Sequence, residues 1–399
     1  MTTTVERPIA TRVDPGNDPY ARLGVATFIN ASGHNTAQGG SLMPDEVLAA
    51  MSAAAKRHVR LADLQAAAAK RIAEVVGAPA ALVGSGAAGC ILLGAAACLT
   101  GKDTARVHAL PQTRPDAVNE IVVWAASGPN YMYQACRAAG AKLLEVGEIG
   151  GRVTPEDFGD ALDARTAGIL LVLASLDQAR EHIPDWREFI EQVCTYADEE
   201  NVPVLVDAAS ELPPRGLIPE LLDLGVAGVI VSGGKAIRGP QSTGLLLGWP
   251  ELIEAATLNG NPNSAIGRPM KVGKEEICGL VAAVERFFGM DELVQLAEWR
   301  GRAVAIETAV RAAGAAGVSA EVIEGHPDYG RPPMVPKTVV RFARGGAAAD
   351  ALYKDLAEGA GGGPKINALR QRDDLIFNPM SLEPGEAETI AERVADLLR

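Results

Sequence analysis

The chain has 399 residues, 48% of them hydrophobic, which is enough for two cored domains or for one large domain with an appendage. Its formal net charge of −13 disfavours broad attraction to nucleic-acid backbones or anionic lipid. The five cysteines are odd in number and never spaced as Cys-x-x-Cys, which indicates neither a disulfide framework nor a zinc site. We therefore expect no nucleic-acid partner, no membrane partner and no metal.

The N-terminal part of the chain contains no sign of export or of membrane anchoring. Residues 1–20 lack the apolar core of a signal peptide, and no apolar run in the chain reaches the roughly 18 residues that a membrane span needs. We expect a cytoplasmic protein in which residues 1–40 form an N-terminal arm. Two Ala-rich stretches, 44–57 and 61–76, are then predicted to be helices.

Short apolar runs alternate with helix-like stretches through the middle of the chain. The runs are near-continuous rather than alternating, which is typical of strands covered by helices on both faces. This pattern predicts an α/β domain over residues 41–265 with a mostly parallel, seven-stranded sheet. The predicted strands are 80–83, 120–124, 141–146, 167–173, 202–207, 227–232 and 243–248.

The last part of the chain, residues 266–399, predicts a smaller α+β domain. It begins with long helices and continues as strand, strand, helix, strand and helix. The strands are expected at 318–325, 337–344 and 374–379, and the later helices at 348–359 and 386–399. The Gly-rich stretch 359–367 is expected to be a hairpin-like or mobile loop.

A glycine motif follows the first strand of the predicted sheet. Gly84, Gly86 and Gly89 have the Gly-x-Gly-x-x-Gly spacing of dinucleotide sites, but Asp103, near the distance of the expected acidic residue, lies in a helix-ending turn. A nicotinamide site is therefore disfavoured. The turn can still offer N–H groups and the Ser85 hydroxyl to one phosphate, although Ser85 can also be a simple helix cap.

Lys235 lies in a glycine cluster between two apolar strands, where burial of a cation is costly. Such a lysine is understandable if its amine is used covalently, as in a Schiff base with pyridoxal 5'-phosphate (PLP). Ser232 precedes it and could add a hydroxyl to the phosphate site. Asp207 ends the strand 202–207, at the edge where α/β sheets bind ligands, and could hold the ring nitrogen protonated. The alternative for Asp207 is a cap of the following turn.

Five stretches of the sequence resemble motifs of a known enzyme family. They are "INASGHNTAQGGSLMPDEVLAAM", "GSGAAGCILLGAAACLTG", "VPVLVDAASELPP", "SGGKAIRGPQSTGLLLG" and "IGRPMKVGKEEICGL". With them the sequence resembles fold-type-I PLP enzymes of the selenocysteine synthase group, in the branch typified by D-glucosaminate-6-phosphate ammonia-lyase. The resemblance implies a homodimer or higher homo-oligomer with shared active sites. It also implies a Schiff base at Lys235, a ring-nitrogen partner at Asp207, and phosphate contacts at Ser85, Gly86, Ala87 and Ser232.

The chain departs from that family in ways that bear on its substrate. Selenocysteine synthases resemble Asp-Leu-Gly-Ser-Gly where this chain has "DAASELPP", and Ser-Gly-Asp-Lys where it has "SGGK". They also carry a tRNA-binding N-terminal domain, for which the first family motif here, beginning by Ile29, leaves no room. His34 stands where the family implies a small hydroxyl residue. We therefore expect a small amino-acid substrate rather than a tRNA.

Further candidates are weaker, and each has a structural alternative. Arg268, with Lys271 and Lys274 nearby, could bind the cofactor phosphate of a neighbouring subunit or an anionic substrate group, or could belong to a solvated helix start. Asn130, Tyr131 and Tyr133 follow the strand 120–124, where this fold often places a ring-stacking side chain, but the tyrosines could equally pack in the core. Two arginines could grip a substrate carboxylate or lie on the surface: Arg341 and Arg372.

The predicted function is removal of the α-proton of an amino acid followed by β-elimination, which yields a 2-keto acid and ammonia. The substrate would be a β-hydroxy amino acid or an amino-sugar acid. A PLP-dependent racemase or aldolase would use the same lysine and acid and stays open. A selenium transferase acting on seryl-tRNA would require a basic appendage, and a non-catalytic binding protein would lack cofactor absorbance.

Overall fold

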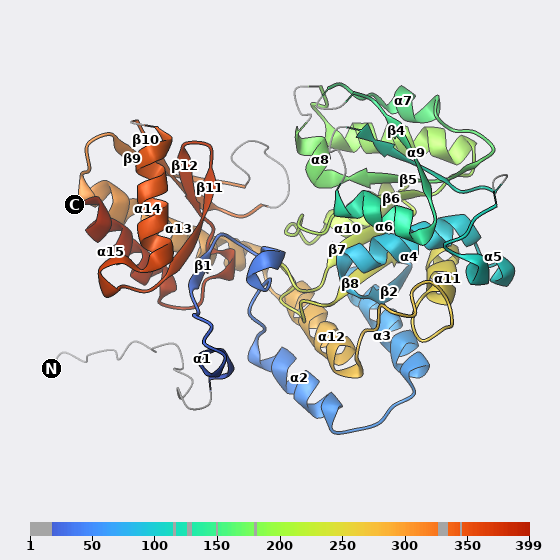
Figure 1. Cartoon of the computed structure of the whole chain (residues 1–399), viewed down its shortest axis with the longest axis horizontal. Helices are drawn as coiled ribbons and strands as arrows, with labels where there is room; N and C mark the ends of the chain where they lie inside the picture. The colour runs from blue at the N-terminus through green and yellow to red at the C-terminus, as the bar shows by residue number, and fades with distance from the viewer. Residues whose placement is uncertain are drawn as a thin grey trace. The chain divides into compact units, whose positions relative to one another are not determined.

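The computed structural model describes residues 18–114, 117–125, 130–148, 151–178, 182–325, 334–343 and 345–399. Contacts divide the chain into two compact units, the larger over residues 41–290 and the smaller over 18–40 together with 291–399 (Figure 1). Residues 266–290, which we expected in the smaller domain, thus belong to the larger unit, because their helix packs on helices from residues 45–76. Each unit is described by itself.

The larger unit is built on a seven-stranded sheet in the described residues, with strand order β2-β8-β7-β6-β5-β3-β4. All neighbouring pairs are parallel except those of β8, which runs antiparallel to β2 and β7. The predicted mostly parallel sheet is confirmed, and each predicted strand is present. Their bounds are β2 Ala80–Gly84, β3 Glu120–Trp124, β4 Lys142–Val146, β5 Thr166–Val172, β6 Val204–Asp207, β7 Gly228–Ser232 and β8 Gly244–Gly248.

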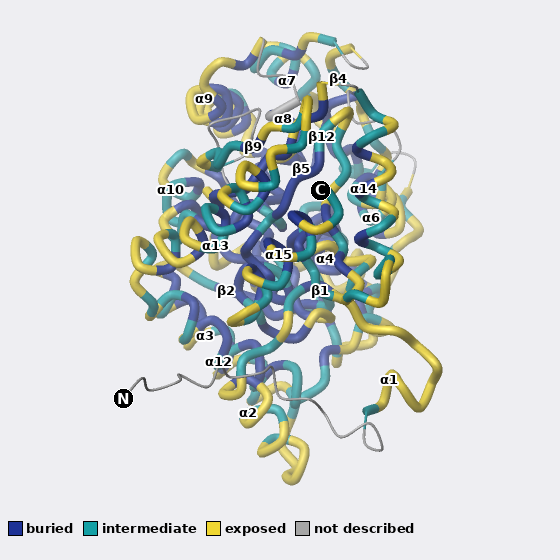
Figure 2. The backbone as a smooth tube through the Cα atoms, turned by 90° about the vertical axis from the view of Figure 1, so that its left-hand side faces the viewer, coloured by how far each residue is buried: buried dark blue, intermediate teal, exposed yellow. Residues whose placement is uncertain are grey.

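The central strands lie deep in the core because their side chains are apolar on both faces. Each residue of β3 and β5 is buried, and β5 is dark blue along its length in Figure 2. The edge strand β4 is more exposed and carries charged residues at two of its positions. The near-continuous apolar runs of the sequence therefore mark the buried strands, as expected for a covered sheet.

Helices surround this sheet (Figure 1). Helix α4 is mostly buried because it consists almost wholly of small and aliphatic residues, and it shares a core with α6, α11 and the strands. The helices predicted at 44–57 and 61–76 are present as α2 and α3. The helices of the unit are α2 Asp45–Ala55, α3 Leu61–Val76, α4 Gly86–Thr100, α5 Thr104–Ala109, α6 Tyr131–Ala139, α7 Pro155–Gly159, α8 Leu173–Gln178, α9 Trp186–Glu199, α10 Leu217–Asp223, α11 Pro250–Asn259 and α12 Lys274–Gly289.

The smaller unit has a five-stranded sheet in the described residues, in the order β1-β11-β12-β10-β9. Its strands are β1 Ile29–Ala31, β9 Val318–Ile323, β10 Lys337–Phe342, β11 Ile366–Gln371 and β12 Asp374–Phe377. Its helices are α1 Pro19–Arg22, α13 Glu292–Ala313, α14 Gly346–Glu358 and α15 Glu386–Leu398, with short 3-10 turns at Thr36–Gln38, Ala360–Gly362 and Pro379–Ser381. The predicted α+β pattern is present, but β1 and β11 were not predicted.

The described residues also bear on membrane insertion and on metal binding. No helix among them is long and apolar enough to cross a membrane. In the same part of the chain, no group of three or more histidine, cysteine, aspartate or glutamate side chains could hold a metal ion.

Candidate active site

Lys235 lies in the connection between β7 and β8. Because β8 runs back along β7 and Ser232 pairs with Gly244, this connection emerges at the edge of the sheet where β7 ends. The glycines before Lys235 are required by close packing, since a Cβ at Gly234 would overlap the backbone of Gln241. The Arg238 N–H donates to the Lys235 carbonyl at 2.9 Å, which closes a tight turn and fixes the lysine backbone.

The Lys235 amine is half-buried and hydrogen-bonded. Its Nζ donates to the hydroxyl oxygen of Ser210 at 2.8 Å. Desolvation lowers the pKa of this amine below its ordinary value, and the carboxylates of Asp207 and Glu211 partly oppose the decrease. A lowered pKa leaves more of the amine in the neutral, nucleophilic form at neutral pH.

Asp207 is the last residue of β6 and its side chain is only 4% exposed. Its Oδ1 accepts a hydrogen bond from the Ala209 N–H at 3.0 Å, so the turn-cap alternative is also realised. Burial raises the pKa of Asp207 to about 6, while the Ala209 N–H and the Lys235 charge oppose the increase. A cation bound against this carboxylate would stabilise its charged form.

The turn between β2 and α4 forms a narrow cradle. Gly86 has a φ of +70°, in the left-handed region that favours glycine, and Ser85 makes no side-chain capping bond to the described helix. A Cβ at Gly244, the first residue of β8, would lie 2.6 Å from the Ala87 nitrogen. Gly244 pairs with both Gly84 and Ser232, so the start of α4 and Ser232 lie at the same edge of the sheet, where they could contact one phosphate.

An amine, a buried carboxylate and a glycine turn at a helix start therefore occur in one unit. These match the aldehyde, the pyridine nitrogen and the phosphate of PLP, so the residues present fit this cofactor. Lys235 could bind the aldehyde carbon, Asp207 the ring nitrogen, and the Ser85–Ala87 turn with Ser232 the phosphate.

The three candidates after β3 have different environments. Tyr133 is 2% exposed and its hydroxyl donates to the Trp124 carbonyl, so it packs in the core. Asn130 caps α6 by accepting from the N–H groups of Met132 and Tyr133, each at 3.1 Å. Tyr131 is 54% exposed, yet desolvation, with smaller contributions from the charges of Asp207 and Glu211, raises its pKa. Of the three, Tyr131 is the one coupled to the candidate site.

The basic residues of 268–274 lie on a loop and a helix start. Arg268 is exposed and its guanidinium donates to the Pro262 carbonyl. Lys271 is exposed, whereas Lys274 donates to the Ala54 carbonyl at 2.9 Å and pairs with Glu275. Met270 of this loop packs against α4, and its Sδ would be 3.7 Å from a Cβ at Gly89.

The remaining predicted residues belong to the smaller unit. His34 is half-buried, with its Nδ1 2.7 Å from the Sδ of Met380. Arg341, on β10, is exposed and pairs with two carboxylates, Glu321 and Asp374. Arg372 is exposed in the turn between β11 and β12 and has a φ of +50°. Their roles toward a substrate stay predictions.

Three residues near Lys235 and Asp207 were missed by sequence reasoning. Ser210 accepts from the Lys235 amine, and Glu211 is a carboxylate that is 4% exposed. Cys90, on α4, is fully buried, and desolvation with a smaller contribution from Asp207 raises its pKa to about 12, which keeps the thiol protonated. Glu211 had a signal in the sequence, since it is a charged residue in an otherwise apolar segment directly after Asp207.

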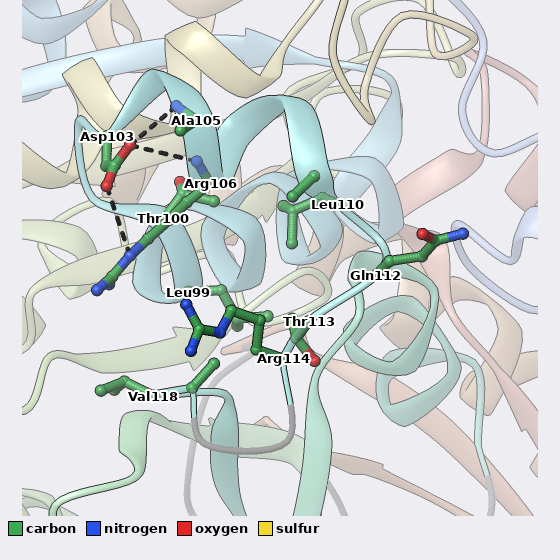
Figure 3. A pocket seen from close by; sticks show the side chains of 12 residues that line it. Leu99, Thr100, Asp103, Ala105, Arg106, Leu110, Gln112, Thr113, Arg114 and Val118 are labelled. Carbon is green, nitrogen blue, oxygen red and sulfur yellow. Dashed lines mark hydrogen bonds and ion pairs between the residues drawn. The ribbon is translucent and has the colours of Figure 1, made fainter.

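A cavity of about 470 Å³ lies at the other end of α4 (Figure 3). It is lined by Leu99 and Thr100 of α4, by α5, and by the loop after it. These residues are about 20 Å along α4 from Ser85 at 1.5 Å per residue, so this cavity is separate from the candidate site. Asp103 caps α5 here by accepting from the Ala105 N–H at 2.8 Å, which agrees with its exclusion as a dinucleotide ligand.

Comparison with known proteins identifies the family. The family model for L-seryl-tRNA selenium transferase (SelA) matches residues 28–298. The chain belongs to this family. A 5'-C-glycyluridine monooxygenase-decarboxylase from a Streptomyces species is 31% identical to it over 95% of this chain and 92% of the relative. A D-glucosaminate-6-phosphate ammonia lyase from Salmonella typhimurium strain 14028s is 30% identical over 72% of this chain and 74% of the relative.

The structural comparison also finds D-glucosaminate-6-phosphate ammonia-lyase. A solved structure of D-glucosaminate-6-phosphate ammonia-lyase superposes with a TM-score of 0.75 and 27% identity, covering 96% of this chain and 99% of that one. The chain has fold type I and is a PLP-dependent enzyme, as the sequence predicted.

Proposed function

We propose that this enzyme removes the α-proton of an amino acid and eliminates a β-substituent, so that a 2-keto acid and ammonia are formed. The observation that supports this most directly is the Lys235 amine, held by Ser210 at 2.8 Å and coupled to the buried Asp207 carboxylate. Bound PLP would supply the electron sink for the electron pair left at Cα. The relationship to D-glucosaminate-6-phosphate ammonia-lyase favours elimination within this class.

In this proposal each side chain has a separate task. Lys235 would hold the cofactor through its aldehyde, and its amine, when free, would accept the proton from Cα. Its lowered pKa supports the accepting step, because the neutral amine is the form that takes up a proton. Asp207 holds the ring nitrogen, and the Ser85, Gly86, Ala87 and Ser232 cradle holds the phosphate. Tyr131 is the proposed ring-stacking residue.

The proposed substrate is a β-hydroxy amino acid or an amino-sugar acid. The name of the Salmonella relative supports an amino-sugar acid that carries a phosphate. Arg268 and Lys271, both exposed, are the proposed partners of a distal phosphate or carboxylate. The proposed substrate contacts of the smaller unit are His34, Arg341 and Arg372.

The test is a panel of D- and L-β-hydroxy amino acids and phosphorylated amino-sugar acids, assayed in parallel for ammonia and for 2-keto acid in deuterated water. Equal amounts of the two products from the parent enzyme, with none from Lys235→Ala, would support elimination. Deuterium at Cα with inverted configuration and no ammonia would establish a racemase instead. Glycine plus an aldehyde would establish an aldolase, and either result would overturn the elimination.

Oxidative decarboxylation is a second candidate, because the Streptomyces relative named for it is 31% identical over 95% of this chain. It differs from elimination in consuming O₂ and releasing CO₂. An oxygen electrode run on the same panel separates the two reactions. O₂ uptake with equal CO₂ release and no free ammonia would favour this candidate, and ammonia release under argon would exclude it for that substrate.

We also propose a homodimer or higher homo-oligomer that does not act on tRNA. Large apolar side chains are exposed around α2, where Leu42 is 60% exposed, Leu48 45% and Val59 50%, and a subunit contact would remove them from water. Sedimentation equilibrium should give at least twice the chain mass of 41.5 kDa. Tight, salt-sensitive binding of seryl-tRNA in a filter assay would overturn the proposal that the enzyme does not act on tRNA.

A further inference from the structure

Ser210 lies on the tight turn that follows β6, and hydrogen bonds fix the backbone of this turn. The Ala208 N–H donates to the Ile230 carbonyl of β7 at 2.9 Å, which continues the pairing of β6 with β7. The Glu211 N–H donates to the Ala208 carbonyl at 3.2 Å and closes the turn. The Ser210 side chain is therefore carried on backbone that is attached to the sheet.

The backbone around Lys235 is fixed in a similar way. The Gly233 N–H donates to the Thr243 carbonyl at 2.9 Å, and the Gly239 N–H donates to the Gly233 carbonyl at 2.8 Å, so the loop closes on itself around the lysine. β7, which leads into this loop, is also the strand to which the Ser210 turn is bonded. The sheet thus sets the spacing between the backbones of Ser210 and Lys235.

One hydrogen bond joins the side chains of these two residues. Lys235 Nζ donates to the Ser210 hydroxyl oxygen at 2.8 Å, a normal distance for such a bond. Among the described residues, this is the one side-chain hydrogen bond that the structure places on the amine. A lysine side chain has many rotamers, and ordering them costs conformational entropy. Ser210, on its fixed turn, offsets part of this cost before a ligand arrives.

The direction of this hydrogen bond suits an amine that attacks an aldehyde. Attack requires the nitrogen lone pair to point at the carbonyl carbon. When one N–H of the neutral amine points at the Ser210 oxygen, the lone pair points away from that oxygen and stays available. The Ser210 turn also begins directly after Asp207, so the hydroxyl that holds the amine and the carboxylate proposed for the ring nitrogen belong to one short segment.

We propose that Ser210 is a positioning residue for Lys235, whose hydroxyl holds the amine in the direction from which it bonds to the cofactor aldehyde. In that step the amine nitrogen bonds to the aldehyde carbon, and the aldehyde oxygen leaves as water with the two amine protons. Ser210 thus affects how often the neutral amine is correctly directed, and this effect remains where the amine is fully deprotonated. The inference rests on the proposed role of Lys235.

The experiment starts from the cofactor-free protein and follows the attachment of PLP. PLP is added at a series of pH values, samples are quenched with borohydride at fixed times, and peptide mapping gives the rate of attachment to Lys235. The variants are compared on the high-pH plateau, where the amine is neutral in each of them, so that a changed pKa cannot produce a difference. Ser210→Ala should attach PLP about threefold to tenfold more slowly there, which is the scale for one lost hydrogen bond.

Further variants and a second reagent make the result specific. Ser210→Thr keeps the hydroxyl and Ser210→Val removes it at nearly the same shape, so the threonine variant should be faster than the valine variant by a similar factor. Ser319→Ala removes an exposed hydroxyl on β9 and should match the parent. Acetic anhydride should label Lys235 at the same plateau rate in the parent and in Ser210→Ala, because this small reagent can approach the amine from several directions.

Three results would overturn the inference. They are equal plateau rates of PLP attachment in the parent and a folded Ser210→Ala, equal rates in Ser210→Thr and Ser210→Val, and an equal slowing of acetic anhydride labelling in Ser210→Ala, which would indicate altered access to the amine. A parent enzyme that shows the expected Ser210 effect but releases no 2-keto acid and ammonia would support the inference and refute the proposed elimination alone.

Discussion

Asp207→Asn should stabilise the cofactor-free protein at neutral pH while it removes most of the activity. Desolvation raises the pKa of Asp207 from 3.8 to about 6, which is a difference of about 2 units. At 1.36 kcal/mol per unit, the ionised carboxylate costs the folded state about 3 kcal/mol. Asparagine has nearly the same shape and can still accept from the Ala209 N–H, so the substitution removes the charge without opening a cavity.

The sign of the pH dependence follows from proton binding. Between about pH 4 and pH 6 the folded protein keeps a proton on Asp207 that the unfolded chain has lost. The contribution of this group to the free energy of unfolding therefore falls as pH rises through that window, and stays low above pH 6. In Asp207→Asn this decrease is absent. The free energy of unfolding of the variant should therefore equal that of the parent near pH 4 and be larger at pH 7 by up to about 3 kcal/mol.

The assay is urea unfolding of both cofactor-free proteins at pH 4.5, 5.5 and 7, with Asp223→Asn as a matched control. Asp223 is exposed at the end of α10, and its substitution should change stability little at any pH. Turnover of Asp207→Asn should fall by roughly 10²–10³-fold, the scale for losing a preorganised electrostatic partner. An Asp207→Asn protein that is less stable than the parent at pH 7, or that retains near-normal turnover, would refute this reasoning.

Other substitutions test the cradle and the two tyrosines. Gly244→Ala places a Cβ 2.6 Å from the Ala87 nitrogen, so it should destabilise the fold by about 1–3 kcal/mol and weaken PLP binding. The control is Gly216→Ala, which should change neither stability nor PLP binding because no described atom lies within 4 Å of a Cβ at Gly216. Tyr131→Ala should weaken cofactor binding about threefold to tenfold in a fluorescence titration, with Tyr131→Phe close to the parent. Tyr133→Phe should cost about 1 kcal/mol in stability with unchanged cofactor affinity, and the opposite pattern would exchange the roles of the two tyrosines.

Most strands of the larger unit could be predicted because they are local apolar runs that the sheet buries, whereas the edge strand β4 is largely exposed. β5, with each residue buried, shows this directly. β1 and β11 gave no such signal. β1 has only three residues, and it pairs with β11 in the register Ile29↔Ile366, which joins two parts of the chain that are far apart in sequence. Pairing with β11, rather than its own short sequence, therefore makes this segment a strand.

The positions of the candidate site residues in the fold were predictable to a similar extent. Lys235 and Asp207 stood out because a charged residue at the end of a buried strand is costly unless it is used. Ser210 could not be identified in this way, since a small hydroxyl residue is common in turns and its contact with Lys235 depends on how two separate segments fold. The different burial of Tyr131 and Tyr133 also required the structure, because nearby positions of one helix point in different directions.

The most direct test of the account is reduction of the PLP-loaded enzyme with borohydride followed by peptide mapping. We predict that the reduced cofactor is attached to Lys235 alone, and that Lys235→Ala lacks both the label and the visible absorbance of the bound cofactor. Attachment to a different lysine such as Lys274, or a parent protein that binds no PLP, would contradict the account.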